Sequence, residues 1–157
     1  MKNFFIKLKI PDEKSMLTLG AKLAHVCKNA AVIFLNGQLG AGKTTLTRGF
    51  LRGLGYEGHV KSPTYTLVES YQLDRRTIYH FDFYRLRDPQ ELEYIGIQDY
   101  FDSKNTCLIE WPDYGAGMLP IPDLSCDIEL NSNGRNVKLT PHSEYGNLIL
   151  HRFENDE

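Results

Sequence analysis

One segment of the sequence has residue types and a spacing that suit phosphate chemistry. Residues 37–44 read GQLGAGKT and match the pattern GxxxxGK(S/T) at every fixed position. Glycines let successive backbone N–H groups curl around phosphate oxygens, the lysine neutralises charge between the β and γ phosphates, and the threonine hydroxyl coordinates Mg²⁺. A plain glycine-rich turn is the alternative, but it does not explain a lysine directly after the last glycine. We therefore predict a nucleotide-binding P-loop whose contacting residues are Gln38, Leu39, Gly40, Ala41, Gly42, Lys43, Thr44 and Thr45.

Such a loop needs an acidic side chain at the end of a neighbouring strand, and the sequence offers two. Glu110 follows the apolar run Cys107 to Ile109, which is the arrangement of a Walker B element, while Asp82 lies two residues after His80 in an aromatic segment. For either acid alone, the alternative is a solvated carboxylate at a strand end. We predict that at least one of them serves Mg²⁺ or the attacking water.

A serine and a threonine flank Pro63 in the segment that follows the P-loop helix. The proline restrains Ser62 to extended geometry, so this segment is predicted to be a loop. Thr64 is then a candidate for a switch hydroxyl that senses the γ-phosphate, with an ordinary turn as the alternative.

The elements around the P-loop fit its requirements. Residues 31–35 are a continuous apolar run, the pattern of a strand covered on both faces, and a helix with Leu46, Phe50 and Leu54 on one side follows the loop. Gly55 is expected to close that helix in a left-handed conformation. The helix beginning at Lys43 adds the positive end of its dipole to the phosphate site. This context is the one that the motif requires.

Period-two and period-3.6 patterns define the remaining elements. We expect strands over 3–10, 65–73 and 77–85, with the last two in an antiparallel hairpin, then a strand over 107–109 and a second hairpin over 124–130 and 137–139. Helices are expected from Asp12-Glu13 to Val26 and from Asp88-Pro89 to about Ile95, and residues 145–157 are weakly specified. In the strand over 77–85, Phe81 and its neighbours on that face are expected to enter the core, leaving the face of His80 and Asp82 for a site. The pattern indicates an α/β fold of the P-loop type, a three-layer mixed sheet with helices on both faces and antiparallel hairpin extensions.

The length of 157 residues suits a single domain over 1–157, and 41% apolar with 24% charged residues excludes a disordered, collagen-like or coiled-coil chain. The net charge of −2 conceals a polarised chain: residues 1–87 contain 14 Lys and Arg against 6 Asp and Glu, and residues 88–157 contain 4 against 14. This polarity suggests an anionic ligand or partner for the first half.

The cysteines and the apolar runs indicate in which cellular compartment the protein is expected. Cys27, Cys107 and Cys126 contain no CxxC pair and are odd in number, so neither a disulfide framework nor a zinc site is indicated. The longest apolar run, Ala30 to Leu35, is far short of a membrane span, and the N-terminal residues lack an apolar stretch of signal-peptide length. We therefore expect a cytoplasmic protein that does not enter a membrane.

Four segments together carry a family resemblance. GQLGAGKTT at 37–45, SPTYTLV at 62–68, HFDFYRL at 80–86 and EWP at 110–112 occur in the order and spacing of the TsaE (YjeE) family, which this sequence resembles over residues 31–115. The P-loop is shared with many families, whereas the other three motifs in this order are specific. His80, Arg85 and Trp111 belong to these motifs, and core packing is the alternative role for Trp111.

The resemblance implies a small bacterial ATPase of tRNA threonylcarbamoyladenosine synthesis that uses ATP and Mg²⁺. It implies a partner, the TsaB–TsaD complex, which modifies the adenosine beside the anticodon of tRNAs reading ANN codons. This protein would reset that complex by ATP hydrolysis without transferring the carbamoyl group, and would meet tRNA only through it. By the same resemblance Lys43 binds phosphate, Thr44 binds Mg²⁺, Thr64 is the switch threonine, and Asp82 and Glu110 serve the metal and the water.

Two other classes of P-loop protein are alternatives. A small-molecule or nucleoside kinase uses the same loop, but only Arg135, Lys138 and Arg152 are basic after residue 104, too few for a phosphate-clamping lid. A GTPase is disfavoured because the sequence contains neither NKxD nor DxxG. Hydrolysis by the isolated protein is expected to be slow, since Arg85 is the one candidate for an internal arginine finger.

Overall fold

The structure, a computed structural model, describes residues 4–73 and 75–156. Residue 3 of the first expected strand and Asp74 of the first expected hairpin lie outside the described residues. The strands are β1 (Ile6–Ile10), β2 (Val32–Asn36), β3 (Val68–Leu73), β4 (Arg76–Asp82), β5 (Asn105–Glu110), β6 (Leu124–Asn131) and β7 (Gly134–Pro141). The helices are α1 (Glu13–Val26), α2 (Lys43–Gly53), α3 (Glu91–Tyr94) and α4 (Glu144–Glu154), with the 3-10 helices η1 (Ile97–Tyr100) and η2 (Pro112–Gly115).

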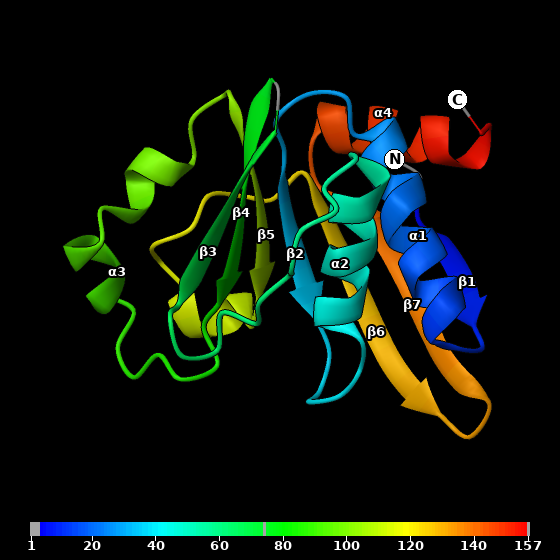
Figure 1. Cartoon of the computed structure of the whole chain (residues 1–157), viewed down its shortest axis with the longest axis horizontal. Helices are drawn as coiled ribbons and strands as arrows, with labels where there is room; N and C mark the ends of the chain where they lie inside the picture. The colour runs from blue at the N-terminus through cyan, green and yellow to red at the C-terminus, as the bar shows by residue number, and fades with distance from the viewer. Residues whose placement is uncertain (1–3, 74, 157) are drawn as a thin grey trace.

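The described strands form one mixed sheet in the order β1-β7-β6-β2-β5-β4-β3 (Figure 1). Its centre is parallel, because β2 pairs in parallel with both β5 and β6, and β4 pairs in parallel with β5. Both expected hairpins are present and antiparallel, and β1 extends the sheet beyond β7. The carboxyl ends of β2, β4 and β5 therefore meet at one edge of the sheet, which is where open α/β sheets bind ligands.

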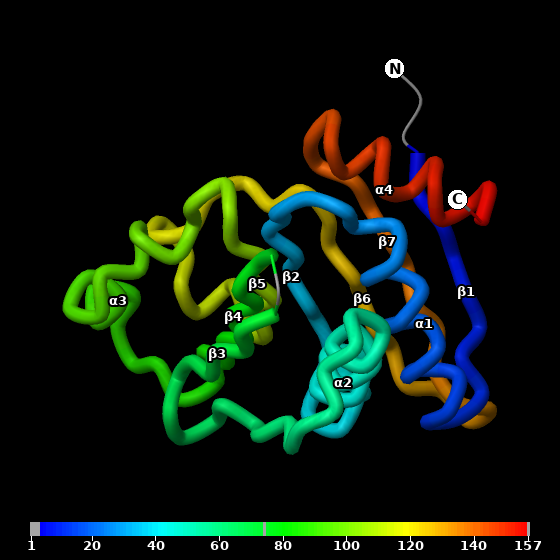
Figure 2. Tube along the Cα trace, turned by 45° about the horizontal axis from the view of Figure 1, so that its top comes forward, coloured from blue at the N-terminus to red at the C-terminus, as the bar shows by residue number. Residues whose placement is uncertain are grey.

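One face of the sheet carries α1 and α2, with α4 packed against α1 and β7 (Figure 2). The two long helices approach closely through glycines. A Cβ added at Gly20 would lie 2.2 Å from the carbonyl oxygen of Leu46, and one added at Gly49 would lie 2.2 Å from that of Leu17. Helix α2, which begins with Lys43, is thereby fixed against α1.

We predict that Gly49→Ala destabilises the fold by about 1–3 kcal/mol, because the new methyl group has to push the two helix backbones apart. Urea denaturation of both proteins measures the change. Lys14→Ala on the exposed side of α1 is the control and should leave stability within about 0.5 kcal/mol of the starting protein. Unchanged stability of the Gly49 variant would show that the helices have room to separate.

The opposite face of the sheet is only partly covered, which corrects the expectation of helix layers on both faces. Leu92 of α3 and Ile97 of η1 pack with Phe81, Cys107 and Ile109 over β4 and β5. Over β1, β7 and β6, by contrast, this face is polar and alternate side chains are exposed, among them Lys7, Lys9, Glu129, Asn136 and Lys138. Most residues of β1 and β7 consequently alternate between exposed and less exposed positions, as expected for a sheet packed on one side, whereas β6 is buried over 124–126 and exposed over 129–131.

The C-terminal residues are better ordered than their sequence suggested. The segment expected to be weakly specified contains α4, which begins after Ser143, whose hydroxyl accepts a hydrogen bond from the Gly146 amide at 2.9 Å. Ile149, Leu150 and Phe153 are buried in the main core. An N-cap serine followed by apolar residues at helical spacing was the available signal.

The first expected hairpin begins later and ends earlier than its pattern indicated. Residues 65–67 are not in β3, because the Leu67 amide closes a turn onto the carbonyl of Pro63 at 2.8 Å and Leu67 has a φ of 73°. The strand expected over 77–85 ends at Asp82. Its two faces are both covered, so the face of His80 is not left open, and that side chain is completely buried.

The three cysteines are free and buried, and burial raises the pKa of the Cys27 thiol to about 11. None of the helices in the described part of the chain is long and apolar enough to cross a membrane.

Candidate functional site

The loop between β2 and α2 has the backbone that anion binding needs. Gly40 and Gly42 have φ values of 79° and 115°, in the region that favours glycine. Gly42 caps α2 without a side-chain acceptor, and the first turn of α2 carries no acid, so its N–H groups are free of side-chain caps. Unpaired amides at a helix N-terminus attract anions. Residues 39–45 line a cavity of about 320 Å³, whereas Gln38 lies outside it and lines a groove on the open face of the sheet.

The Lys43 ammonium is held inside this site. Its side chain is only 4% exposed, donates a hydrogen bond to the Gly37 carbonyl, and lies 3.8 Å from the centre of the Trp111 ring. Burial lowers the pKa of Lys43, and the carboxylates of Glu110 and Asp82 act in the opposite direction. The site therefore holds a cation close to two acids.

Glu110 links the end of β5 to the start of α2. Its Oε2 accepts a hydrogen bond from the Thr44 hydroxyl at 3.0 Å and lies 2.5 Å from Nε2 of His80. Glu110 is 3% exposed and His80 is fully buried, so this pair is shielded from solvent, whereas Thr44 is half-buried and lines the cavity. The structure brings together the hydroxyl and the carboxylate that the sequence assigned to Mg²⁺.

Asp82 lies beside Glu110, since the two residues are in register on the parallel strands β4 and β5. One of its oxygens accepts a hydrogen bond from the Thr64 hydroxyl at 3.0 Å, and the other accepts one from the Tyr84 amide at 2.9 Å. The Ser62 hydroxyl lies 2.8 Å from that of Thr64. The loop residues 62–64 are thus tied to the strand end by Asp82, and Thr64 lines the same cavity as Lys43.

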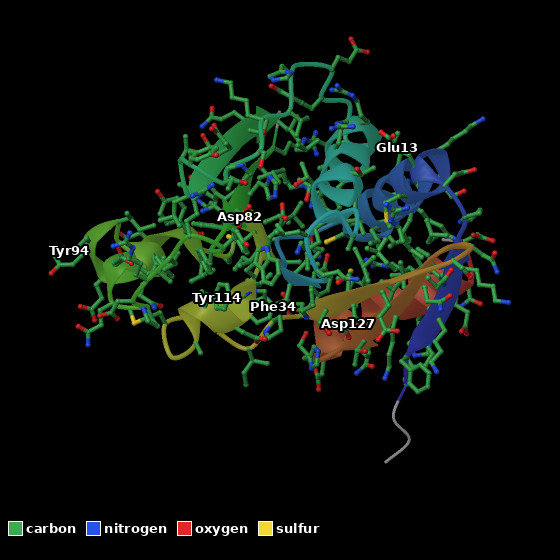
Figure 3. The ribbon with its side chains drawn as sticks, turned by 90° about the horizontal axis from the view of Figure 1, so that it is seen from below. Glu13, Phe34, Asp82, Tyr94, Tyr114 and Asp127 are labelled. Carbon is green, nitrogen blue, oxygen red and sulfur yellow. The ribbon has the colours of Figure 1, made fainter. Side chains whose placement is uncertain are left out.

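One aromatic motif residue, Trp111, lies at the rim of the cavity. Trp111, with a φ of 56°, turns the chain directly after Glu110 and stacks on Tyr114 with an angle of 6° between the rings. Figure 3 shows Tyr114 and Asp127 on the side of the sheet opposite to Glu13 and α1. Trp111 is half-buried and covers Lys43, so it belongs to the site as well as to the packing around η2.

Arg85, like Gln38, is a predicted site residue that the structure does not bring to the cavity, whereas Ser62 and His80 reach it only through Thr64 and Glu110. The Arg85 guanidinium is exposed, stacks on the Tyr65 ring at 4.3 Å and donates to the Tyr65 hydroxyl at 3.1 Å. Two other arginines line the cavity, Arg48 and Arg135, together with Glu13 and Met16 of α1. Helical spacing on α2 could have indicated Arg48, four residues after Thr44, whereas Arg135 is distant in sequence and lacks any motif.

Comparisons with known proteins show the family and the fold of this chain. The family model described as "Threonylcarbamoyl adenosine biosynthesis protein TsaE" matches residues 10–138. The tRNA threonylcarbamoyladenosine biosynthesis protein TsaE of Haemophilus influenzae is 50% identical over 93% of this chain and 96% of its own length, and that of Bacillus subtilis is 41% identical over 70% and 67%. The crystal structure of Bacillus subtilis YdiB superimposes with a TM-score of 0.83 at 26% identity, covering 99% of this chain and 98% of the other. The chain therefore belongs to the TsaE family.

Proposed function

We propose that this protein binds ATP with Mg²⁺ and hydrolyses it in the synthesis of threonylcarbamoyladenosine in tRNA. The observation that carries the proposal is the convergence of five residues from four separate segments on one cavity: Lys43 and Thr44 at the start of α2, Thr64 in its loop, and Asp82 and Glu110 at two strand ends. Membership of the TsaE family supplies the pathway.

The residues of the cavity fit a magnesium-bound triphosphate. In P-loop sites Mg²⁺ is held by a threonine hydroxyl, one or two carboxylates and the phosphates themselves. Thr44 and Glu110 offer that hydroxyl and carboxylate 3.0 Å apart. When bound, the metal would neutralise charge on the β and γ phosphates. We assign Thr44 and Glu110 to the metal side, and Lys43 with the amides of residues 39–45 to the phosphates.

Thr64 and Asp82 receive a different role. Because Asp82 bonds the Thr64 hydroxyl and the Tyr84 amide, it is suited to hold the 62–64 loop at the γ-phosphate end of the cavity. Thr64 then acts as the switch hydroxyl, whose hydrogen bond to Asp82 changes when a γ-phosphate enters or leaves. His80 orients Glu110 from the buried side.

The partner is the TsaB–TsaD complex, and tRNA is met only through it, in the cytoplasm. Slow turnover by the isolated chain fits the position of Arg85, which is stacked on Tyr65 outside the cavity. A partner that completes the site, or a rearrangement of Arg85, would supply a further cation at the transition state, in addition to Arg48 and Arg135 of the cavity lining. ATP hydrolysis is then available to reset the complex, while the transfer of the carbamoyl group stays with TsaD.

Capture of purified TsaB–TsaD on the immobilised protein tests this proposal. Capture is expected with ATP and is expected to be weaker with ADP or without nucleotide, and the rate of ATP hydrolysis should rise when TsaB–TsaD is added. Phosphorylation of a small molecule without capture of the complex would favour the kinase alternative. No rise in hydrolysis at saturating partner would remove the resetting role.

A further inference from the structure

The β6–β7 hairpin reaches the P-loop through one arginine. Nε of Arg135 donates to the carbonyl oxygen of Ala41 at 2.6 Å, and its Nη2 donates to that of Gly40 at 3.1 Å. One guanidinium thus grips two successive peptide groups of the loop from a residue more than 90 positions away in the sequence. This forked geometry is specific to arginine, because a lysine ammonium is a point donor.

We propose that Arg135 is a positioning residue for nucleotide binding, which fixes the Gly40–Ala41 and Ala41–Gly42 peptides with their carbonyls turned toward the hairpin. This inference rests on the proposed ATP site. In a peptide plane the N–H points away from the C=O, so an arginine that holds these two oxygens directs the amides of Ala41 and Gly42 away from the hairpin. Because the Ala41 amide also donates to the Gln38 carbonyl at 3.0 Å, the Gly42 amide is the one that this arrangement offers to a phosphate. Charge-assisted hydrogen bonds of this kind are stronger than neutral ones and polarise the peptides that they bind.

The β6–β7 hairpin is packed against β1, so the backbone of Arg135 is held in a fixed position. Gly134, at the hairpin turn, has a φ of 127°, and a Cβ added there would lie 2.5 Å from the carbonyl oxygen of Ile10. Arg135 pairs in register with Ile10 across β1 and β7. It also lies against the loop glycine, because a Cβ added at Gly42 would be 3.5 Å from Nε of Arg135 and 3.1 Å from Cε of Met16. A side chain anchored in this way limits the conformations open to the loop before the ligand arrives, and such preorganisation raises affinity.

The test is ATP binding by calorimetry and ATP hydrolysis at several ATP concentrations for Arg135→Ala and Arg135→Lys. We expect the Kd and the KM for ATP to rise about tenfold in Arg135→Ala, while kcat at saturating ATP stays within about twofold, the pattern for lost binding common to ground and transition states. In Arg135→Lys most of the rise in Kd and KM should persist, because lysine retains the positive charge but lacks the two-pronged guanidinium. Thermal unfolding of each variant without nucleotide checks that the fold is kept.

Lys138→Ala is the matched control, since it removes a positive charge from the same strand on the opposite, exposed face and should bind ATP like the starting protein. If Arg135→Lys binds ATP as tightly as the starting protein, the positive charge alone is sufficient and the positioning role is wrong. If Arg135→Ala also binds ATP as tightly as the starting protein, Arg135 has no role in nucleotide binding. When the starting protein binds ATP and Lys43→Ala does not, unchanged ATP affinity in Arg135→Ala contradicts the role of Arg135 and leaves the proposed function intact. If the starting protein binds no ATP, the proposed function itself fails.

Discussion

Lys43→Ala is expected to weaken ATP binding at least about a hundredfold, because it removes a cation buried beside the loop that receives the phosphates. The starting protein already holds this ammonium against the cost of burial, between the Gly37 carbonyl and the Trp111 ring and near two carboxylates. Phosphate oxygens would compensate that cost better than these neighbours do. Isothermal calorimetry with Mg-ATP measures the loss.

Folding of this variant is expected to be retained, because α2 is anchored by Leu46, Phe50 and Leu51 and not by the lysine. A thermal unfolding curve without nucleotide checks this. Lys28→Ala, at an exposed lysine outside the cavity lining, is the matched control and should bind ATP normally. ATP affinity maintained in the Lys43 variant would mean that the loop is a structural turn and that the nucleotide assignment is wrong.

The convergence of Thr44 and Glu110, the residues proposed for the metal, was predictable because each residue follows a recognisable strand. The apolar run ending at Glu110 and the loop motif after β2 each carry a local pattern, and the parallel sheet brings their ends together without further information. What local patterns did not provide is which acid pairs with which hydroxyl. The structure resolves this geometry, with Glu110 on Thr44 and Asp82 on Thr64.

The errors at His80 and at Arg135 have a common origin in tertiary packing. A period-two pattern assigns faces but does not reveal whether a polar face is covered, and His80 is completely buried with its Nε2 2.5 Å from Oε2 of Glu110. Arg135 follows the turn of a hairpin that the sequence predicted, but its place beside the P-loop depends on the pairing of β7 with β1 and of β6 with β2, and these distant pairings leave no pattern in the residues around position 135. The polar face of β1, β7 and β6 fits the period-two patterns of these strands, and the expectation that was wrong is that helices cover both sides of the sheet here.

Trp111 has both of the roles that the sequence left open, packing and a place in the site. As a lone tryptophan after a buried strand it suited core packing, and as part of a motif it suited the site. In the structure it packs between Tyr84 and Tyr114 and also covers the Lys43 ammonium. Cation–π contact of this kind offsets part of the cost of burying the lysine before a phosphate is available.

Glu110→Gln is expected to reduce ATP hydrolysis by about 10²- to 10⁴-fold while ATP binding changes little. The amide keeps the shape of the side chain and a hydrogen-bond acceptor for Thr44, but it lacks the negative charge for the metal and for the attacking water. Binding depends mainly on Lys43 and on the loop amides, which the substitution does not remove. Calorimetry and single-turnover hydrolysis on the same preparation separate the two effects.

Glu129→Gln on the exposed face of β6 is the control for the loss of one carboxylate, and it should hydrolyse ATP at the starting rate. Asp82→Asn provides the discriminating comparison, because Asp82 touches Thr64 and the Tyr84 amide instead of the Thr44 hydroxyl. If Asp82 positions the switch loop, Asp82→Asn should capture TsaB–TsaD equally well with ATP and with ADP. Glu110→Gln should still capture the complex better with ATP than with ADP. Full hydrolysis by Glu110→Gln together with loss in Asp82→Asn would reverse the two assignments, and the metal side would then belong to β4.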